Sequence, residues 1–349
     1  MVPSVPRAAR RRASRGGLLA VHAHPDDETL ATGGLLAVWA AAGRPVTVVT
    51  CTRGELGEVI GAGLAHLEGD GPALAAHRET ELAAALAALG VADHVFLDRV
   101  GVGARPDGAL PVRFSDSGMA WAGVGRAAGG TDLPDGAFVA TGLDDAAGRL
   151  ARVLRDRRPD VVVTYEPGGG YGHPDHIRAH AVTVRALELA GDAEVDLDGS
   201  PAHVPGAVLW AVVAWEVLRR AYRTLPDLPV AAALLDDHPE LVRPDPDGLL
   251  PSMAVPTADV DVTVDVTGVL DRVVAALAAH GTQVRSIALD PARVVHAARA
   301  GRSGDRRPAV VGCYALSNDV LAPLLSRESY RLAGGDRGVH WPAAVRPVA

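Results

Sequence analysis

The amino-acid sequence of this chain predicts an α/β fold. We expect a Rossmann-like, mostly parallel sheet with helices on both faces, followed by a smaller C-terminal α/β portion. Through the first two-thirds of the 349 residues, short apolar runs alternate with stretches of helical apolar spacing. The runs are apolar throughout, which is typical of parallel strands covered on both faces. Hydrophobic residues make up 48% and charged residues 22%, so the composition is globular.

Each element of the predicted sheet has a local reason in the sequence. An apolar, β-branched run of about five residues is typical of a buried strand, and a glycine after a helical stretch commonly ends a helix. Gly43 and Gly90 end the first two predicted helices in this way. In chain order we expect a strand at 18–22, a helix at 34–42, a strand at 46–51, a helix at 72–89, a strand at 95–97, a helix at 143–157, a strand at 161–165 and a helix at 174–189.

The pattern changes after about residue 200. We expect a strand at 208–214, a loop-like stretch at 234–251, an alternating segment at 260–266 and a helix at 269–279. The chain therefore divides into a disordered basic tail at 1–16, a core at 17–200 that includes a long loop at 101–141, and a C-terminal portion at 201–349 that packs on the core.

The basic residues are unusual, because all 34 are arginines and the chain contains no lysine. Schiff-base and pyridoxal-phosphate enzymes need a lysine amine, and a P-loop NTPase needs its motif lysine, so these classes are excluded. Five arginines and no acidic residue lie in the first sixteen positions. The rest of the chain has 29 basic and 42 acidic residues, which argues against a nucleic-acid partner.

The sequence also indicates the compartment. No window holds the 18 or more apolar residues of a membrane span, so we expect no membrane partner. Two cysteines, Cys51 and Cys313, are too few for a disulfide framework and favour the reducing cytoplasm.

Two clusters of polar residues follow predicted strands. Residues 24–28 read His-Pro-Asp-Asp-Glu, and residues 168–176 read Gly-Gly-Gly-Tyr-Gly-His-Pro-Asp-His. Ligands of parallel sheets bind at the carboxyl ends of the strands, so we expect both clusters at one edge. Either cluster alone is also what a capped helix start looks like.

Taken together, the clusters favour a metal centre. Two histidines and one carboxylate leave an open position on a tetrahedral zinc ion, as catalytic sites require. One of the two adjacent carboxylates at 26 and 27 can bind the metal while the other acts as a base.

With these two clusters and several further motifs, the chain resembles the LmbE/PIG-L family of zinc-dependent N-deacetylases. The resemblance rests on segments 23–28 and 173–176 and on further motifs at 49–52, 57–61, 116–120, 169–172 and 276–284. It covers about residues 18–335 and is greatest for the mycothiol-pathway branch of the family. Segments 102–114 and 121–141 are longer than the family pattern, and the arginine tail has no counterpart in it.

The resemblance implies a role for individual residues, and one zinc ion per chain, with Fe²⁺ as an alternative. The metal ligands would be His24, Asp27 and His176, and Asp26 would be the general base. Tyr171 would polarise the acetyl carbonyl, His173 would stabilise charge or assist protonation of the amine, and Asp175 would orient a histidine. The residues in contact with the substrate would be Arg78, Asp116 and Glu58.

The implied reaction is hydrolysis of the N-acetyl group of an N-acetylglucosaminyl-inositol, a small glycoside, by a cytoplasmic enzyme that is either a monomer or a homo-oligomer. The alternative within the family is amide cleavage of mycothiol S-conjugates. That branch carries a lysine shortly after the Asp-Asp-Glu segment, whereas residues 29–32 here are uncharged. A non-catalytic sugar- or nucleotide-binding module is an alternative of another class. We expect five further histidines to be structural, namely His22, His77, His94, His180 and His280.

Overall fold

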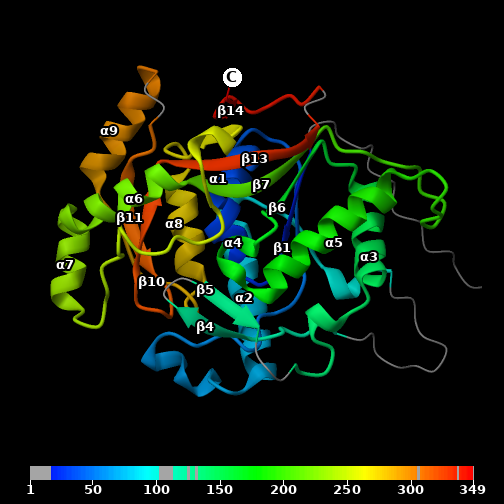
Figure 1. The fold of residues 1–349 in the computed structure, drawn as a ribbon, viewed down its shortest axis with the longest axis horizontal. Helices are drawn as coiled ribbons and strands as arrows, with labels where there is room; N and C mark the ends of the chain where they lie inside the picture. Colours follow the sequence, from blue (N-terminus) through cyan, green and yellow to red (C-terminus); the bar gives the residue numbers. More distant parts are fainter. Residues whose placement is uncertain are drawn as a thin grey trace, which may run out of the picture.

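The computed structural model describes residues 17–101, 113–123, 126–129, 133–304, 307–335 and 338–348. Within them the main sheet has the strand order β14-β9-β13-β7-β6-β1-β2-β3, with β8 beside β7 (Figure 1). Neighbours from β7 to β3 are parallel, whereas β13 is antiparallel to β7 and β9, and β14 is antiparallel to β9. The predicted mostly parallel sheet is confirmed, and its antiparallel strands at one edge make it a mixed sheet. Its strands are β1 (Leu18–His22), β2 (Val46–Thr50), β3 (Asp93–Phe96), β6 (Val161–Tyr165), β7 (Ala207–Ala214), β8 (Ala254–Val255), β9 (Val262–Asp265), β13 (Arg327–Gly335) and β14 (Val345–Pro347).

Helices cover both faces of this sheet, as expected. Successive residues of β1 point to opposite faces, so Leu18 packs in one core cluster and Leu19 in another. Helices α1, α2 and α8 cover the first face, and α3 and α5 the second (Figure 1). These helices are α1 (Asp27–Ala41), α2 (Gly71–Leu89), α3 (Leu143–Arg157), α5 (Pro174–Gly191) and α8 (Leu270–Ala279).

One helix begins earlier than its apolar pattern predicts. Helix α1 begins at Asp27 rather than at residue 34, because its polar first turns are buried among partners. The Asp27 carboxylate accepts the backbone N–H of His24 at 2.9 Å, and the Thr32 hydroxyl donates to the Glu28 carbonyl. Strand β3 is likewise shifted toward the N-terminus, and part of the predicted loop at 234–251 is helical.

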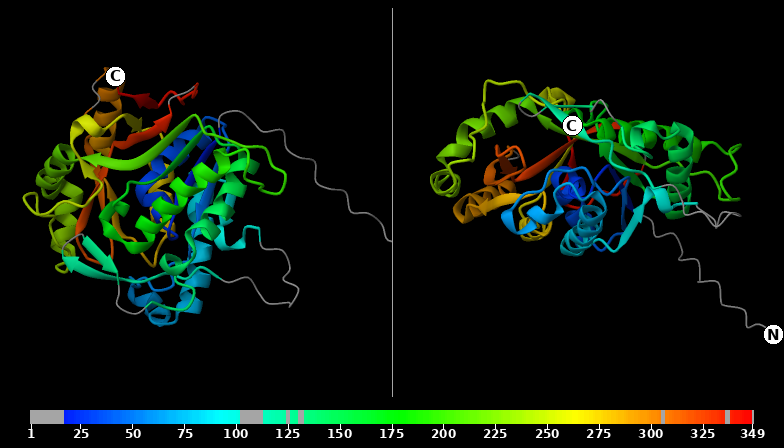
Figure 2. Two further views of the ribbon diagram at one scale, coloured as in Figure 1. Left: turned by 45° about the vertical axis from the view of Figure 1, so that its right-hand side comes forward. Right: turned by 90° about the horizontal axis from the view of Figure 1, so that it is seen from below.

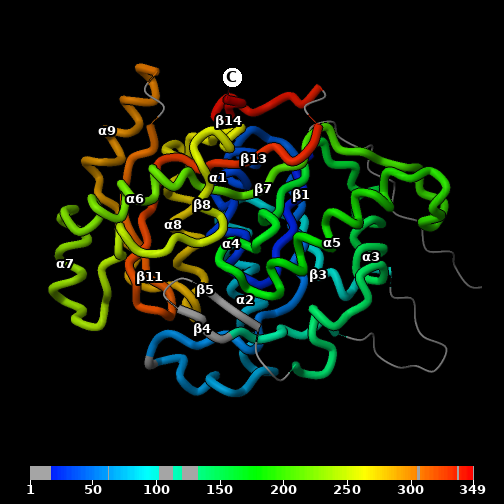
Figure 3. Tube along the Cα trace, viewed as in Figure 1, coloured from blue at the N-terminus to red at the C-terminus, as the bar shows by residue number. Residues whose placement is uncertain are grey.

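The chain after residue 200 contributes to two sheets. Strands β7, β9, β13 and β14 extend the main sheet, while β10, β11 and β12 form a separate antiparallel sheet that packs with α6, α7 and α9. Figures 2 and 3 show this second unit beside the main sheet, on the side away from α3 and α5. The boundary at residue 200 stays a prediction. The unit consists of α6 (Trp215–Thr224), α7 (Pro229–Asp237), β10 (Arg285–Leu289), α9 (Pro291–Arg302), β11 (Val310–Ala315) and β12 (Leu321–Leu325).

Shorter elements complete the described fold. Strands β4 (Met119–Gly123) and β5 (Arg126–Gly129) pair in a hairpin, and α4 (Gly169–Gly172) is one turn before α5. No described helix is long and apolar enough to cross a bilayer. The predicted tail at 1–16 lies outside the described residues, as do 102–112, 124–125 and 130–132 of the predicted loop. The 3₁₀ turns are Ala62–Leu67, Leu97–Arg99, Phe138–Ala140, Leu225–Asp227 and Thr257–Asp259.

A buried arginine fastens the segment that follows α5. Arg155, on α3, is 3% exposed. Its guanidinium donates to the carbonyl oxygens of Leu189, Ala190, Asp192, Val195 and Ser200. These five bonds use the planar, branched donor set that arginine has and lysine lacks.

We therefore expect Arg155→Lys to lower the free energy of unfolding by about 2–4 kcal/mol, because it leaves buried carbonyl groups without donors. Urea denaturation measures the change. Arg152→Lys is the matched control on the same helix. Its ion pair with Asp198 is partly exposed, so we expect a loss below about 1 kcal/mol. Equal losses in the two variants would contradict this account of Arg155.

Candidate metal centre and catalytic cavity

The two polar clusters meet at one edge of the sheet. Strands β1 and β6 are parallel neighbours, with Leu18 beside Val161. Their carboxyl ends therefore lie together, and the chain leaves them toward α1 and α5. His24 follows β1, and His176 lies in the first turn of α5. Figure 3 shows α4 and the start of α5 beside the end of β1.

Two imidazole nitrogens and one carboxylate converge there. The Nδ1 atom of His24 lies 3.3 Å from a carboxylate oxygen of Asp27, and Nε2 of His176 lies 3.2 Å from the other. The two nitrogens are 3.3 Å apart. Two ligands that are each about 2.1 Å from a tetrahedral ion are roughly 3.3–3.4 Å from one another. The two nitrogens thus have the spacing of two ligands of one small ion, and the Asp27 carboxylate turns one oxygen toward each of them.

In both His24 and His176, the ring nitrogen that faces away from the shared position lies near a hydrogen-bond acceptor. Nδ1 of His176 is 3.1 Å from the carbonyl oxygen of Gly169, which can only accept, so this nitrogen carries the proton. Nε2 of His24 is 3.2 Å from the Asp175 carboxylate. Ser117 holds that carboxylate through its N–H at 2.8 Å and its hydroxyl at 2.5 Å. Both imidazoles therefore turn their other ring nitrogen toward the shared position, where the neutral form of each ring can bind a metal.

The electrostatics of the centre favour positive charge. Burial alone would lower the pKa of His24, but Asp116, Asp175 and Asp27 raise it well above its usual value. Burial alone would raise the pKa of Asp27, but His176 and His24 lower it well below its usual value. The chemistry of the donors and their surroundings thus fits a bound cation. His173 also lies within reach, and it forms a second possible donor set with His24 and His176.

The Asp26 side chain stands beside this centre in a strained backbone conformation. Its φ angle is 122°, which non-glycine residues rarely adopt. The Glu28 carboxylate accepts its N–H at 3.0 Å, and Arg78 lies 3.3 Å from its carboxylate. Burial raises the pKa of Asp26, Arg78 opposes the rise, and the neighbouring Asp27 adds to it. A carboxylate with a raised pKa is a better proton acceptor.

A buried ion pair supports this turn. The fully buried Glu28 and His280 approach to 2.8 Å, so the end of α8 is tied to the start of α1. Burial would raise the pKa of Glu28, but His280 lowers it to about 2. Burial would lower the pKa of His280, but Glu28 raises it. We expected His280 to be structural. It does not reach the donor atoms, but it fixes the turn that presents Asp26.

The centre opens into a cavity of about 690 Å³. His24, Asp26 and Asp27 line it, together with Tyr171 and His173. The Tyr171 ring meets the His176 ring edge to face, with centroids 5.0 Å apart. Nδ1 of His173 accepts the Asp175 N–H at 3.1 Å, so Nε2 is left to face the cavity. Burial, followed by the neighbouring His24 and His176, lowers the pKa of His173 to about 2.

The three residues expected to contact substrate also line this cavity, in different environments. Arg78 is buried and donates to the carbonyl oxygens of Pro25 and Gly54. Asp116 is buried and accepts the N–H groups of residues 56 and 118. Glu58 is exposed. Eight of the ten residues of the predicted site thus line one cavity, and the other two, Asp175 and His176, are buried beside His24. Arg78 also holds two loops together.

Two site residues were missed by sequence reasoning. Tyr165 stacks on the His176 ring at a centroid distance of 4.3 Å, and its hydroxyl oxygen accepts the N–H of Ala23. It is the last residue of a predicted strand, the position where site residues were sought. Ser117, which holds Asp175, has no signal outside the family motif at 116–120.

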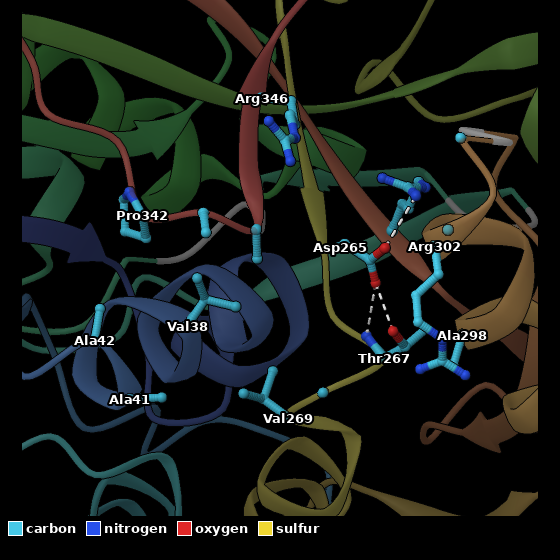
Figure 4. Close-up of a pocket in the computed structure, with 16 residues that line it drawn as sticks. Val38, Ala41, Ala42, Asp265, Thr267, Val269, Ala298, Arg302, Pro342 and Arg346 are labelled. Carbon is cyan, nitrogen blue, oxygen red and sulfur yellow. Dashed lines mark hydrogen bonds and ion pairs between the residues drawn. The ribbon is translucent and has the colours of Figure 1, made fainter.

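A larger cavity of about 790 Å³ lies at the other end of α1, near α9 and β14 (Figure 4). Its charged side chains do not converge on one point. Figure 4 shows Arg302 and Arg346 pointing apart, and the Asp265 carboxylate accepts bonds from Thr267 and Arg327. We therefore place the candidate site at the smaller cavity.

Comparisons with known proteins agree along most of the chain. The PIG-L family model, described as GlcNAc-PI de-N-acetylase, matches residues 19–187. A 1D-myo-inositol 2-acetamido-2-deoxy-alpha-D-glucopyranoside deacetylase of Kineococcus radiotolerans is 45% identical over 332 residues, covering 94% of this chain and 80% of that protein. Proteins of the same name from Rhodococcus erythropolis and a Nocardioides species are 41% and 37% identical. These two matches cover 93% and 92% of this chain, and 94% and 93% of the relatives.

We expect His280→Ala to lower the free energy of unfolding by about 3–5 kcal/mol, because it leaves the buried Glu28 carboxylate without its cation. His296→Ala, on an exposed position of α9, is the control and should change little. Denaturation with a chelator present excludes any contribution from bound metal. If His280→Ala lowers the free energy of unfolding by less than about 1 kcal/mol, the Glu28–His280 ion pair does not stabilise the fold as we infer.

The contribution of this pair also depends on pH in a defined direction. The lowered pKa of Glu28 gives stability that is present above its usual 4.5 and is lost as the pH falls toward 2. The raised pKa of His280 gives stability that is complete below its usual 6.5 and is lost at higher pH. The stability difference between the parent and a Glu28→Gln, His280→Gln double variant should therefore be larger at pH 5.5 than at pH 9. A difference that grows above pH 7 would contradict the assignment.

Proposed function

This chain belongs to the PIG-L family of N-deacetylases, and from that premise we propose its reaction. It hydrolyses the N-acetyl group of 1-O-(2-acetamido-2-deoxy-α-D-glucopyranosyl)-1D-myo-inositol, giving acetate and the free amine for mycothiol biosynthesis. Curated relatives matching more than nine-tenths of the chain are named for this deacetylation. The chain is thus a hydrolase that cleaves the C–N bond of a linear amide. The observation that carries the proposal is a pair of histidine nitrogens 3.3 Å apart, each 3.2–3.3 Å from one oxygen of the Asp27 carboxylate, with Asp26 beside them in the same cavity.

We propose that His24, Asp27 and His176 hold one Zn²⁺ per chain, with Fe²⁺ as the alternative. When bound, such an ion polarises the acetyl carbonyl and increases the acidity of a nearby water molecule. The bonds from Gly169 and Asp175 to the outer nitrogens keep both imidazoles oriented toward it.

Asp26 accepts the proton of the attacking water. Its raised pKa makes the carboxylate more basic, while Arg78 favours its ionised form. The turn that Glu28 holds directs the carboxylate into the cavity before substrate arrives, so the reaction does not have to reorganise it.

Tyr171 and His173 stabilise the negative charge that develops on the acetyl oxygen. His173 accepts a bond at Nδ1, so it donates from Nε2 as a neutral imidazole, a role that also suits assistance to the leaving amine. Arg78, Asp116 and Glu58 hold substrate hydroxyls, and Arg78 in addition positions the Asp26 turn.

The partner is therefore a small glycoside. We propose a cytoplasmic location, which the two buried, unpaired cysteines Cys51 and Cys313 support because free thiols suit a reducing compartment. A homo-oligomer stays a prediction.

Substitutions in the centre separate metal binding from proton transfer. Asp26→Asn should keep the metal and lower kcat/KM by about 10²–10⁴-fold, because it removes the base but no donor atom. His176→Ala should lose the metal, measured by elemental analysis of the purified protein. His180→Ala, one turn further along α5, is the control and should keep both metal and turnover. If Asp26→Asn turns over at the parental rate, another group is the base.

A substrate panel tests the reaction itself. Incubation with zinc and N-acetylglucosaminyl-inositol should release acetate and amine, with a smaller rate on a mycothiol S-conjugate. A faster rate on the conjugate would favour the amidase alternative. A protein that binds no metal and releases no amine from any member would be a binding module instead.

A further inference from the structure

The catalytic cavity extends beyond the metal centre to a wall made by the C-terminal part of the chain. Tyr222 on α6 and Tyr314 on β11 line this wall, with Ser317 and Asn318 from the turn after β11. In Figures 1 and 3, α6 and β11 lie on one side of α4, the turn that carries Tyr171. None of these four residues belongs to the motifs that identified the metal centre.

The two tyrosines present uncommitted hydroxyl groups to this space. Both side chains are partly buried, and neither hydroxyl has a hydrogen-bond partner among the described residues. Burial raises the pKa of Tyr222, and burial together with the nearby Tyr222 raises the pKa of Tyr314 to about 12. Partly buried hydroxyls without protein partners are groups that a ligand can satisfy.

The rest of the wall defines the kind of ligand. Leu316, Leu321 and Pro244 give it apolar surface, while the amide of Asn318 and the hydroxyl of Ser317 give it polar groups. A polyol ring has the matching combination, with C–H groups on its faces and hydroxyls around its edge. Apolar walls with a few placed polar groups are typical of sites for small molecules.

The charges of the cavity exclude an anionic ligand at this wall. Among the described residues that line the cavity, Arg78 is the single cation other than histidine, and it is bound to Pro25, Gly54 and Asp26 at the metal end. Asp245 and Glu58 are acidic. A phosphate group beside these carboxylates would be repelled, with no arginine to pair with it.

The wall is fixed relative to the catalytic residues. The Met253 N–H and the Ser252 hydroxyl both donate to the carbonyl oxygen of Gly170, each at 2.9 Å. The same Ser252 hydroxyl lies 2.7 Å from a Glu166 carboxylate oxygen, so the two acceptors share its single proton. The segment that adjoins the wall is thus bonded to the turn that carries Tyr171.

We propose that Tyr222 and Tyr314 form a subsite for the uncharged polyol ring attached to the N-acetylglucosamine, and that they set the preference for this ring. The inference rests on the proposed deacetylase function. The glucosamine ring lies at the metal centre, and the two hydroxyls bond the edge of the second ring. A subsite of hydroxyl donors discriminates against ligands that cannot use them.

Steady-state kinetics on three substrates tests the proposal in the metal-loaded protein. The substrates are N-acetylglucosaminyl-inositol, N-acetylglucosamine and N-acetylglucosamine 1-phosphate. The parent should prefer the first and be slowest on the last. Tyr222→Phe with Tyr314→Phe should lower kcat/KM about 10- to 100-fold on the inositol glycoside, through KM, and leave N-acetylglucosamine unchanged.

Arg220→Gln, on an exposed position of α6, is the control and should match the parent on all three substrates. Thermal denaturation checks that the phenylalanine variants are folded. Equal losses on the inositol glycoside and the monosaccharide would overturn the proposal, since the tyrosines would then support the centre as a whole. Unchanged kinetics of the double variant would overturn it as well, and so would a parental preference for the phosphate.

Calorimetry separates the subsite from turnover. In an Asp26→Asn background, the two phenylalanine changes should weaken binding of the inositol glycoside by the same 10- to 100-fold. Undiminished binding there would refute the subsite. If the parent hydrolyses none of the three substrates but binds the inositol glycoside through both tyrosines, the deacetylase proposal fails and the subsite remains.

Discussion

The buried carboxylate of Glu28 is the constraint on which the arrangement of the candidate site depends. One carboxylate accepts the backbone N–H of Asp26, the hydroxyl of Thr29 and a bond from His280. A left-handed φ at Asp26 is costly by itself, and this local bonding offsets the cost. The same contact joins residues separated by most of the chain. The position of the Asp26 carboxylate beside the proposed metal centre is therefore a property of the whole fold, because the end of α8 has to be in place for His280 to neutralise Glu28.

Sequence patterns predicted the parts of this arrangement that are local or repeat along the chain. The strand at 161–165 and the helix at 143–157 match the structure to the residue, because each is a single uninterrupted pattern. The meeting of segments 24–28 and 173–176 was predictable too, since neighbouring parallel strands end at the same edge. The individual roles came from the family resemblance.

The sequence patterns could not predict which polar residues far apart in the chain would pair with one another. His280 is expected to be structural because it belongs to no cluster of polar residues in the sequence, whereas its partner Glu28 lies in the first helix. The apolar pattern places the start of α1 at residue 34, too late, because the first turns of the helix are polar. Polar residues that are buried by one another across a fold have no apolar periodicity to reveal them.

The order of the sheet has a consequence for folding during synthesis. Strand β13 lies between β7 and β9, yet it is made long after β7. While residues between Ala214 and Arg327 are being added, the edge of β7 that will receive β13 has no partner. At about 5–20 residues per second this interval lasts on the order of ten seconds. A nascent chain with an open, apolar strand edge can pair with other chains. The yield of folded protein should therefore depend on what shields the edge of β7 while the chain is on the ribosome.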